Sequence, residues 1–181
     1  MTKTNAMVGN RHCGRWRVLV LALGALVSAC SGVERAGDAA NSPPPVETGA
    51  SERHPISGLE ISEVVVVSGD TRHAFKTEMA ITKDQQARGL MFRETLADDE
   101  AMLFPNEVPQ TRSFWMKNTP ISLDIIFIGP DQRITNIETA APYSLDSVRS
   151  KAEVIAVFEI RGGLAQELGM AAGDRVEWTL P

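Results

Sequence analysis

The sequence predicts a mainly β fold: a compact β-sandwich or barrel-like roll of about seven or eight short strands with two short helices. Two observations carry this prediction. Short β-branched or alternating apolar runs recur between Gly, Pro and Asp turn residues along positions 58–181. Only two stretches of that range show the start and stop signals of a helix instead.

The first strands form a predicted hairpin. "EVVVVS" at 63–68 is β-branched and stops at the turn pair Gly69-Asp70. "HAFKTEMAI" at 73–81 alternates polar and apolar residues, which is typical of a strand with one buried face. We therefore expect the second run to pair back on the first.

The first helix follows directly. Thr82 with Gln85 three residues later is a capping-box signature, and Gly89 is a predicted helix stop. The apolar run "AMLF" before Pro105 then predicts a brief strand, because proline lacks the backbone donor that a strand needs.

"RSFWMK" at 112–117 and "ISLDIIFI" at 121–128 are predicted strands joined by "NTP" as a hairpin. In the second strand alternate apolar residues share one face, which we assign to the core, and Asp124 points the other way. The same alternation places Trp115 and Lys117 on the face of Asp124. An indole, an ammonium and a carboxylate are thus expected to gather on one face.

The remaining runs complete the predicted fold. Gly and Pro turns separate two more strands, a short helix and a terminal strand. These are "RITNIE" at 133–138, "AEVIAVFEI" at 152–160, the helix "LAQELGM" at 164–170, and "AGDRVEWTL" at 172–180.

The N-terminal residues read as an export signal. Arg residues precede the apolar run 18–27, which is too short to span a bilayer as a helix. The run ends in "VSAC", which resembles the bacterial lipobox, in which the cysteine carries the lipid. We therefore predict a lipoprotein signal peptide at 1–29 and lipid attachment at Cys30. A plain cleaved signal or an uncleaved anchor is the alternative.

Residues 30–57 are rich in Ala, Gly, Ser and Pro and lack apolar periodicity, so we expect a disordered tether before a single domain at 58–181. Ser31 directly after the cysteine favours the outer membrane by the same resemblance, with the protein facing the periplasm. Of the two cysteines, Cys13 lies in the signal and Cys30 carries lipid, so we expect no disulfide.

The charge of the chain limits its partners. It carries 18 Lys and Arg against 23 Asp and Glu, a formal net charge of −5. This balance argues against nucleic acid and against electrostatic binding to anionic lipid. The expected membrane contact is therefore the lipid on Cys30.

No catalytic or cofactor motif is present. The sequence lacks a Gly-rich phosphate loop, a G-x-S-x-G elbow and an H-E-x-x-H pair. Only His54 and His73 follow the signal segment, too few for a histidine zinc site. We expect no cofactor and no metal, and we favour a binding protein over an enzyme.

The candidate ligand-binding residues are those of the predicted hairpin face with one neighbour. Trp115 is expected to stack a small polar or sugar-like ligand, and polar groups beside it to hydrogen-bond the ligand. The structural alternative is a cross-strand pair of Lys117 with Asp124, covered by Trp115. The candidate set is Arg88, Trp115, Lys117, Asn118 and Asp124.

Three other functions stay open. The hairpin face could dock another envelope protein, which an exposed apolar patch would favour. An enzyme using Lys117 and Asp124 would need a strongly perturbed lysine pKa. A Cu(I) site would need the sulfurs of Met91, Met102 and Met116 to converge, although methionine is also an ordinary core residue.

Three stretches together resemble the DUF192 family of uncharacterised bacterial and archaeal proteins. They are "RGLMFRETLADDEAMLFPNE", "SFWMKNTPISLDIIFI" and "VFEIRGGLAQELGMAAGDRVEW". The resemblance covers about residues 64–178 and implies a compact, mainly β fold and frequent export, but no activity. Pro120 after "NT" is a mild departure. The matching positions are 88–91, 102–104, 114–119, Leu123, Asp124, Phe127, Gly173 and Asp174.

Overall fold

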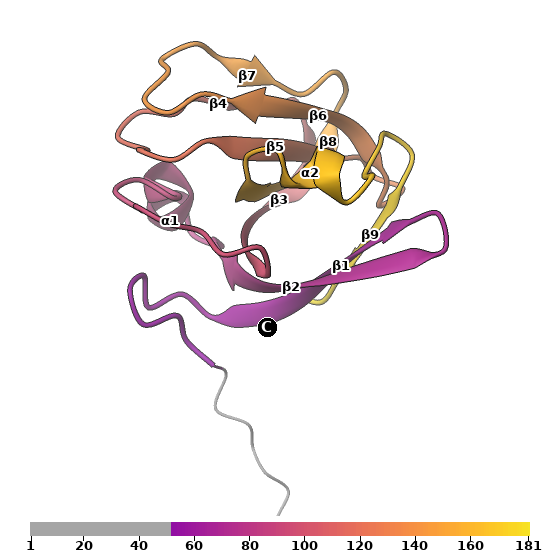
Figure 1. Ribbon diagram of the computed structural model, residues 1–181, viewed down its shortest axis with the longest axis horizontal. Helices are drawn as coiled ribbons and strands as arrows, with labels where there is room; N and C mark the ends of the chain where they lie inside the picture. Colours follow the sequence, from indigo (N-terminus) through magenta and orange to yellow (C-terminus); the bar gives the residue numbers. More distant parts are fainter. Residues whose placement is uncertain (1–51) are drawn as a thin grey trace, which may run out of the picture. The chain divides into compact units, whose positions relative to one another are not determined.

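A mixed sheet of seven strands dominates the fold, and two further strands form a small sheet (Figure 1). The computed structural model describes residues 52–181. In that part of the chain the elements are β1 (Ile61–Ser68), β2 (Thr71–Met79), α1 (Lys83–Arg88), β3 (Glu100–Gln110), β4 (Ser113–Phe114), β5 (Leu123–Ile128), β6 (Ile134–Ala140), β7 (Val148–Arg149), β8 (Val154–Arg161), α2 (Leu164–Glu167) and β9 (Arg175–Trp178).

The strands of the main sheet lie in the order β6-β5-β8-β3-β2-β1-β9. Neighbours are antiparallel except β2 and β3, which are parallel. A parallel pair needs a crossover connection, and α1 lies in it. The predicted mainly β fold with two short helices is confirmed.

The main sheet curls until its two ends approach each other. Ile134 N, at the start of β6, donates to Asp174 O over 2.9 Å, and Gly173 N donates to Ile134 O over 2.8 Å. A single bridge joins Arg133 to Arg175. No continuous ladder of hydrogen bonds links β6 to β9 among the described residues, so the curled sheet is not a closed barrel.

The predictions that rest on short stretches of sequence, such as helix caps and turns, are confirmed. Thr82 caps α1 with the complete capping box, and Gly89, with a φ of 48°, ends the helix. β1 and β2 pair with Ser68 opposite Thr71, so the chain turns at Gly69-Asp70 as predicted. The strands predicted at 152–160 and 172–180 correspond to β8 and β9.

The predicted hairpin of 112–117 with 121–128 is wrong. β4 contains only Ser113 and Phe114 and pairs with β7, a strand that we did not predict. β5 pairs with β6 and β8 instead. The chain leaves strand geometry because Met116 N donates to Ser144 O over 2.8 Å, and Asn118 then adopts a left-handed turn with a φ of 57°.

β3 is longer than the predicted strand. It runs past Pro105 to Gln110, and its register against β8 shifts between these two residues. Proline occurs in strands at such irregularities, because the ladder there does not need its missing donor.

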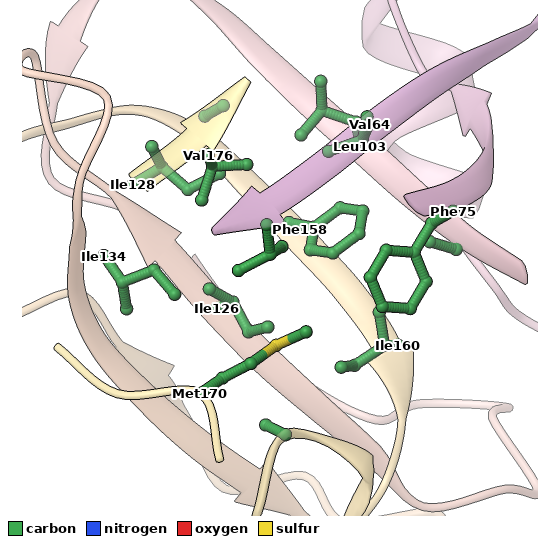
Figure 2. Close-up of a cluster of buried hydrophobic side chains, with 14 of the residues drawn as sticks. Val64, Phe75, Leu103, Ile126, Ile128, Ile134, Phe158, Ile160, Met170 and Val176 are labelled. Carbon is green, nitrogen blue, oxygen red and sulfur yellow. The ribbon is translucent and has the colours of Figure 1, made fainter. Parts of the chain in front are cut away.

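The first hydrophobic core lies on one face of the main sheet, and Figure 2 shows its side chains. Every strand of that sheet contributes to it, and α2 covers part of it with Leu164 and Ala165. Phe75 and Phe158 meet edge to face with ring centroids 5.4 Å apart.

The second hydrophobic core lies on the other face of the sheet. Leu123, Ile125 and Phe127 of β5 belong to it, whereas Ile126 and Ile128 belong to the first core. We predicted only one buried face for this strand. Both faces are covered, so Asp124 lies in the interior and not on an exposed face.

The packed part of the chain begins before the predicted boundary at residue 58. His54 is buried, its Nε2 lies 3.5 Å from Arg93 Nη1, and Arg93 Nη2 donates to both carboxylate oxygens of Glu78. Arg53 bridges to Glu60 nearby. The predicted signal peptide, Cys30 and the tether up to residue 51 lie outside the described residues. No helix within the described residues is long and apolar enough to cross a membrane.

Candidate functional site

One buried carboxyl in the second core has no partner. Glu159 on β8 lies between Met102 of β3 and Ile125 of β5, and both neighbours belong to that core. The residue is 5% exposed. Within residues 52–181 nothing donates a hydrogen bond to its carboxyl or forms an ion pair with it. Burial raises the pKa of Glu159 to about 8, so the carboxyl is mainly protonated at neutral pH.

The carboxyl faces a pocket of about 230 Å³ between the C-terminal end of α1, β4 and the sheet. We call it the Glu159 pocket. Its wall combines apolar and polar groups, and Arg88, Arg112 and Glu159 are its ionisable members. Its lining residues are Gln86, Ala87, Arg88, Gly89, Leu90, Met91, Phe104, Arg112, Ser113, Phe114, Trp115, Met116, Thr119, Leu123 and Glu159.

The exposed lining residues are positioned by α1 and β4. Arg88 is the last residue of α1, and its guanidinium has no hydrogen bond or ion pair within the described part of the chain. Trp115, directly after β4, is 51% exposed. The Nζ atom of Lys117 lies 5.2 Å from the centre of the indole ring, which is a cation–π contact.

Arg112 is held more firmly than Arg88. Its Nη1 and Nη2 atoms donate to Gln86 Oε1 over 3.2 Å, and Nη1 also donates to Asn106 Oδ1. The guanidinium stands 5.2 Å from the ring centre of Phe114. Burial lowers the pKa of Arg112 from its usual value, although a guanidinium remains charged at any physiological pH.

Three turns beside the pocket hold their backbones in the left-handed region. Phe92, Asn118 and Tyr143 have φ angles of 64°, 57° and 59°. Phe92 N donates to Asn118 O over 2.7 Å, and Tyr143 N donates to Thr119 O over 3.0 Å, so the turns support one another. We call these three turns the pocket rim. Left-handed residues other than glycine are strained, and such strain gathers at functional sites.

The sequence pattern of the DUF192 family, described only as an uncharacterized ACR, matches residues 64–178. The chain belongs to the DUF192 family. The match includes every lining residue of the Glu159 pocket. Many positions by which this chain resembles DUF192 lie in that lining, from the "RGLM" at 88–91 to Leu123.

Two solved structures are similar to this chain. A protein of unknown function from Novosphingobium aromaticivorans DSM 12444 is 45% identical, with a TM-score of 0.69; the match covers 77% of this chain and 100% of that chain. A protein from Sinorhizobium meliloti 1021, described as a candidate transcription regulator, is 34% identical, with a TM-score of 0.64; that match covers 66% of this chain and 95% of that chain. No curated protein matches this chain.

The structure brings four of the five predicted site residues of this DUF192 protein to one region. Arg88 and Trp115 line the Glu159 pocket. Lys117 contacts Trp115 without lining the pocket. Asn118 belongs to the rim, and its Nδ2 atom lies 3.9 Å from the sulfur of Met91.

Asp124 does not join them. It is 1% exposed and accepts hydrogen bonds from Thr139 Oγ1 over 2.6 Å and from Ala165 N over 2.9 Å. Ala165 lies in the first turn of α2, so Asp124 satisfies one of the free backbone donors at that helix start. The expected pair of Lys117 with Asp124 is therefore absent from the described structure.

Sequence reasoning missed Glu159 and Arg112. The only sequence signal for Glu159 is a charged residue inside the otherwise apolar strand "VIAVFEI". Among residues 52–181 no group of three His, Cys, Asp or Glu side chains could hold a metal ion. Met91 and Met116 line the pocket, but Met102 does not, so its lining provides only two of the three sulfurs of the Cu(I) hypothesis.

Proposed function

We propose that this DUF192 protein is an exported, lipid-anchored binding module that takes a small polar ligand into the Glu159 pocket. The observation that carries the proposal is the buried carboxyl of Glu159, which faces a pocket and lacks a partner in the described protein. A buried polar group without a hydrogen bond costs free energy that a partner would recover. A ligand in the pocket supplies such a partner.

The other lining residues suit the same function. Trp115 is an exposed aromatic residue of the lining that can stack a ligand, and Arg88 offers a guanidinium without a partner among residues 52–181. A pocket that combines apolar and aromatic side chains with a few polar groups is the usual architecture of a small-molecule site. The export signal and the lipid on Cys30 rest on the N-terminal sequence alone.

A docking surface for another envelope protein is the second candidate. Exposed Phe92, Trp115, Tyr143 and Leu145 favour it, because large apolar side chains rarely gather on the surface of a monomer without a role. An enzyme that uses Lys117 with Asp124 is not proposed, since the two side chains have separate partners. The acidic net charge argues against transferring the description of the Sinorhizobium protein to this chain.

A thermal-shift screen of the purified protein against sugars, cell-wall fragments, amino acids, carboxylic acids and Cu(I) tests the proposal. A ligand at ~100 times its dissociation constant adds about 2.7 kcal/mol to the free energy of unfolding, which raises the melting temperature measurably. The shift should disappear in Trp115→Ala and become smaller in Glu159→Gln. It should persist in Leu180→Ala, which removes an exposed apolar side chain outside the pocket. The proposal fails if no compound shifts the wild type, or if the pocket variants keep the full shift.

A further inference from the structure

The ionisable groups of the Glu159 pocket divide into two kinds. Arg88 and Arg112 carry positive charge, and no other lining residue except Glu159 can ionise. Within residues 52–181 neither guanidinium forms an ion pair or hydrogen bond with the carboxyl of Glu159, and burial raises the pKa of that carboxyl. The lining therefore carries the positive charge of two arginines and a carboxyl that is mainly neutral at pH 7. This positive charge contrasts with the net charge of −5 of the whole chain.

The lining also contains several apolar side chains. Phe104, Phe114, Met116 and Leu123 belong to the second core or pack against it, and all four line the pocket. A ligand that fills the pocket contacts these side chains. An apolar or aromatic part of the ligand would pack against them, while Gln86, Ser113 and Thr119 add polar groups to the same lining.

We propose that the ligand is a small carboxylic acid that also carries a second hydrogen-bond acceptor. Arg88 binds its carboxylate, and the protonated carboxyl of Glu159 donates a hydrogen bond to its second acceptor. The inference rests on the proposed function and names its ligand class. A guanidinium pairs with a carboxylate through two parallel hydrogen bonds, and Arg88 has no competing partner among residues 52–181. Arg112 already donates to Gln86 and Asn106, so it contributes mainly charge.

The charged groups around Glu159 indicate which group should control the pH dependence of ligand binding. Besides the two lining arginines, Glu78 lies beyond Met102 on the same face, paired with Arg93 next to His54. Glu138 lies beyond Ile125 and pairs with Lys151, with 3.3 Å between Nζ and Oε1. Glu78 and Glu138 therefore each have a partner of their own.

The binding should therefore follow the protonation of Glu159. A neutral carboxyl donates a hydrogen bond to the ligand, whereas an ionised one repels the anion. With a pKa of about 8, the protonated fraction falls about tenfold between pH 7 and pH 9, and the affinity should fall with it.

Calorimetry with matched probes tests the inference. The probes are 4-methoxybenzoate and N-acetylglycine, each beside its primary amide, with glucose as a neutral reference. Both acids stay ionised from pH 7 to pH 9, so the ligand does not titrate. At least one acid should bind, with its amide weaker by about tenfold or more, the effect of one lost charge-assisted contact. Arg88→Gln should weaken the acid similarly, and Leu180→Ala should not.

The pH dependence is the second readout. The wild type should lose about tenfold in affinity between pH 7 and pH 9, and Glu159→Gln should show no such loss. Equal pH dependence in both proteins would overturn the role of the Glu159 proton. If only the amides or glucose bind, and Trp115→Ala abolishes that binding, the anion is wrong although the pocket binds ligands. If none of the probes binds, the carboxylic-acid class is overturned, and the broader screen decides separately whether the pocket binds anything.

Discussion

Replacing Glu159 by glutamine should stabilise the protein, and increasingly so as the pH rises. Burial raises the pKa of Glu159 from 4.5 to about 8. Between these values the unfolded chain has released the proton that the folded protein still holds, so stability falls as the pH increases. Each pH unit in this window costs about 1.4 kcal/mol, which gives about 3 kcal/mol at pH 7 and roughly 5 kcal/mol above pH 8. Glutamine has nearly the same shape and no proton to lose.

Urea unfolding of the wild type and Glu159→Gln at pH 5, 6, 7, 8 and 9 measures this difference directly. The buried amide of glutamine adds an offset that is the same at every pH, so the pH dependence of the difference carries the result. Glu153→Gln, at an exposed carboxyl shortly before the same strand, corrects for the loss of one charge. A difference that stays constant from pH 5 to pH 9 would mean that Glu159 ionises freely in the folded protein, and the reasoning about its burial would be refuted.

Three further substitutions separate structural residues from binding residues. Arg93→Leu should lower the free energy of unfolding by about 3–5 kcal/mol, because it leaves the carboxylate of Glu78 buried and unpaired. The double variant Glu78→Leu with Arg93→Leu should lose less stability. Urea unfolding of the single and double variants measures both effects. Asp124→Ala should cost about 2 kcal/mol by freeing Ala165 N, with ligand affinity unchanged in calorimetry. Trp115→Ala should change the unfolding free energy by less than about 1 kcal/mol while removing the ligand-induced thermal shift.

The sequence predicts this fold best where the cause lies within a few residues. The capping box of Thr82 and Gln85, the stop at Gly89 and the turn after Ser68 each depend on neighbours in the chain, and all are confirmed. β8 is similar, because a run of apolar, largely β-branched residues favours a strand whatever its partners.

The pairing of strands that lie far apart in the chain could not be predicted from the sequence. β4 joins β7 across more than thirty positions of the chain, and β7 has only two residues, too few for any periodicity. Alternate residues of 121–128 do lie on opposite faces of β5, but we predicted one of these faces to lie at the surface, and both are buried. A strand buried on both faces can carry the same alternation, so the position of Asp124 could not be derived from it.

The candidate site was partly predictable for the same reason. Arg88 and Trp115 stand out in the sequence as a helix-terminal cation and a tryptophan next to polar residues. Glu159 does not stand out, because a glutamate in a strand normally faces water. Only the three-dimensional structure shows that α1, β4 and their turns cover this face of the sheet and leave a pocket over the carboxyl.

Among the described residues, three buried carboxylic acids now differ in a way that bears on function. Glu78 is paired with Arg93, and Asp124 accepts two hydrogen bonds, so each supports the fold. Glu159 lacks a partner among the described residues, burial raises the pKa of its carboxyl, and it lines the pocket whose rim contains the left-handed residues Phe92, Asn118 and Tyr143. A buried carboxyl without a protein partner and strained backbone turns therefore occur at the same pocket. Both features are expected at a site that is maintained for binding and not for stability. The consequence is a difference in sign: substitution at Asp124 should lower stability and leave binding intact, whereas Glu159→Gln should raise stability and weaken binding.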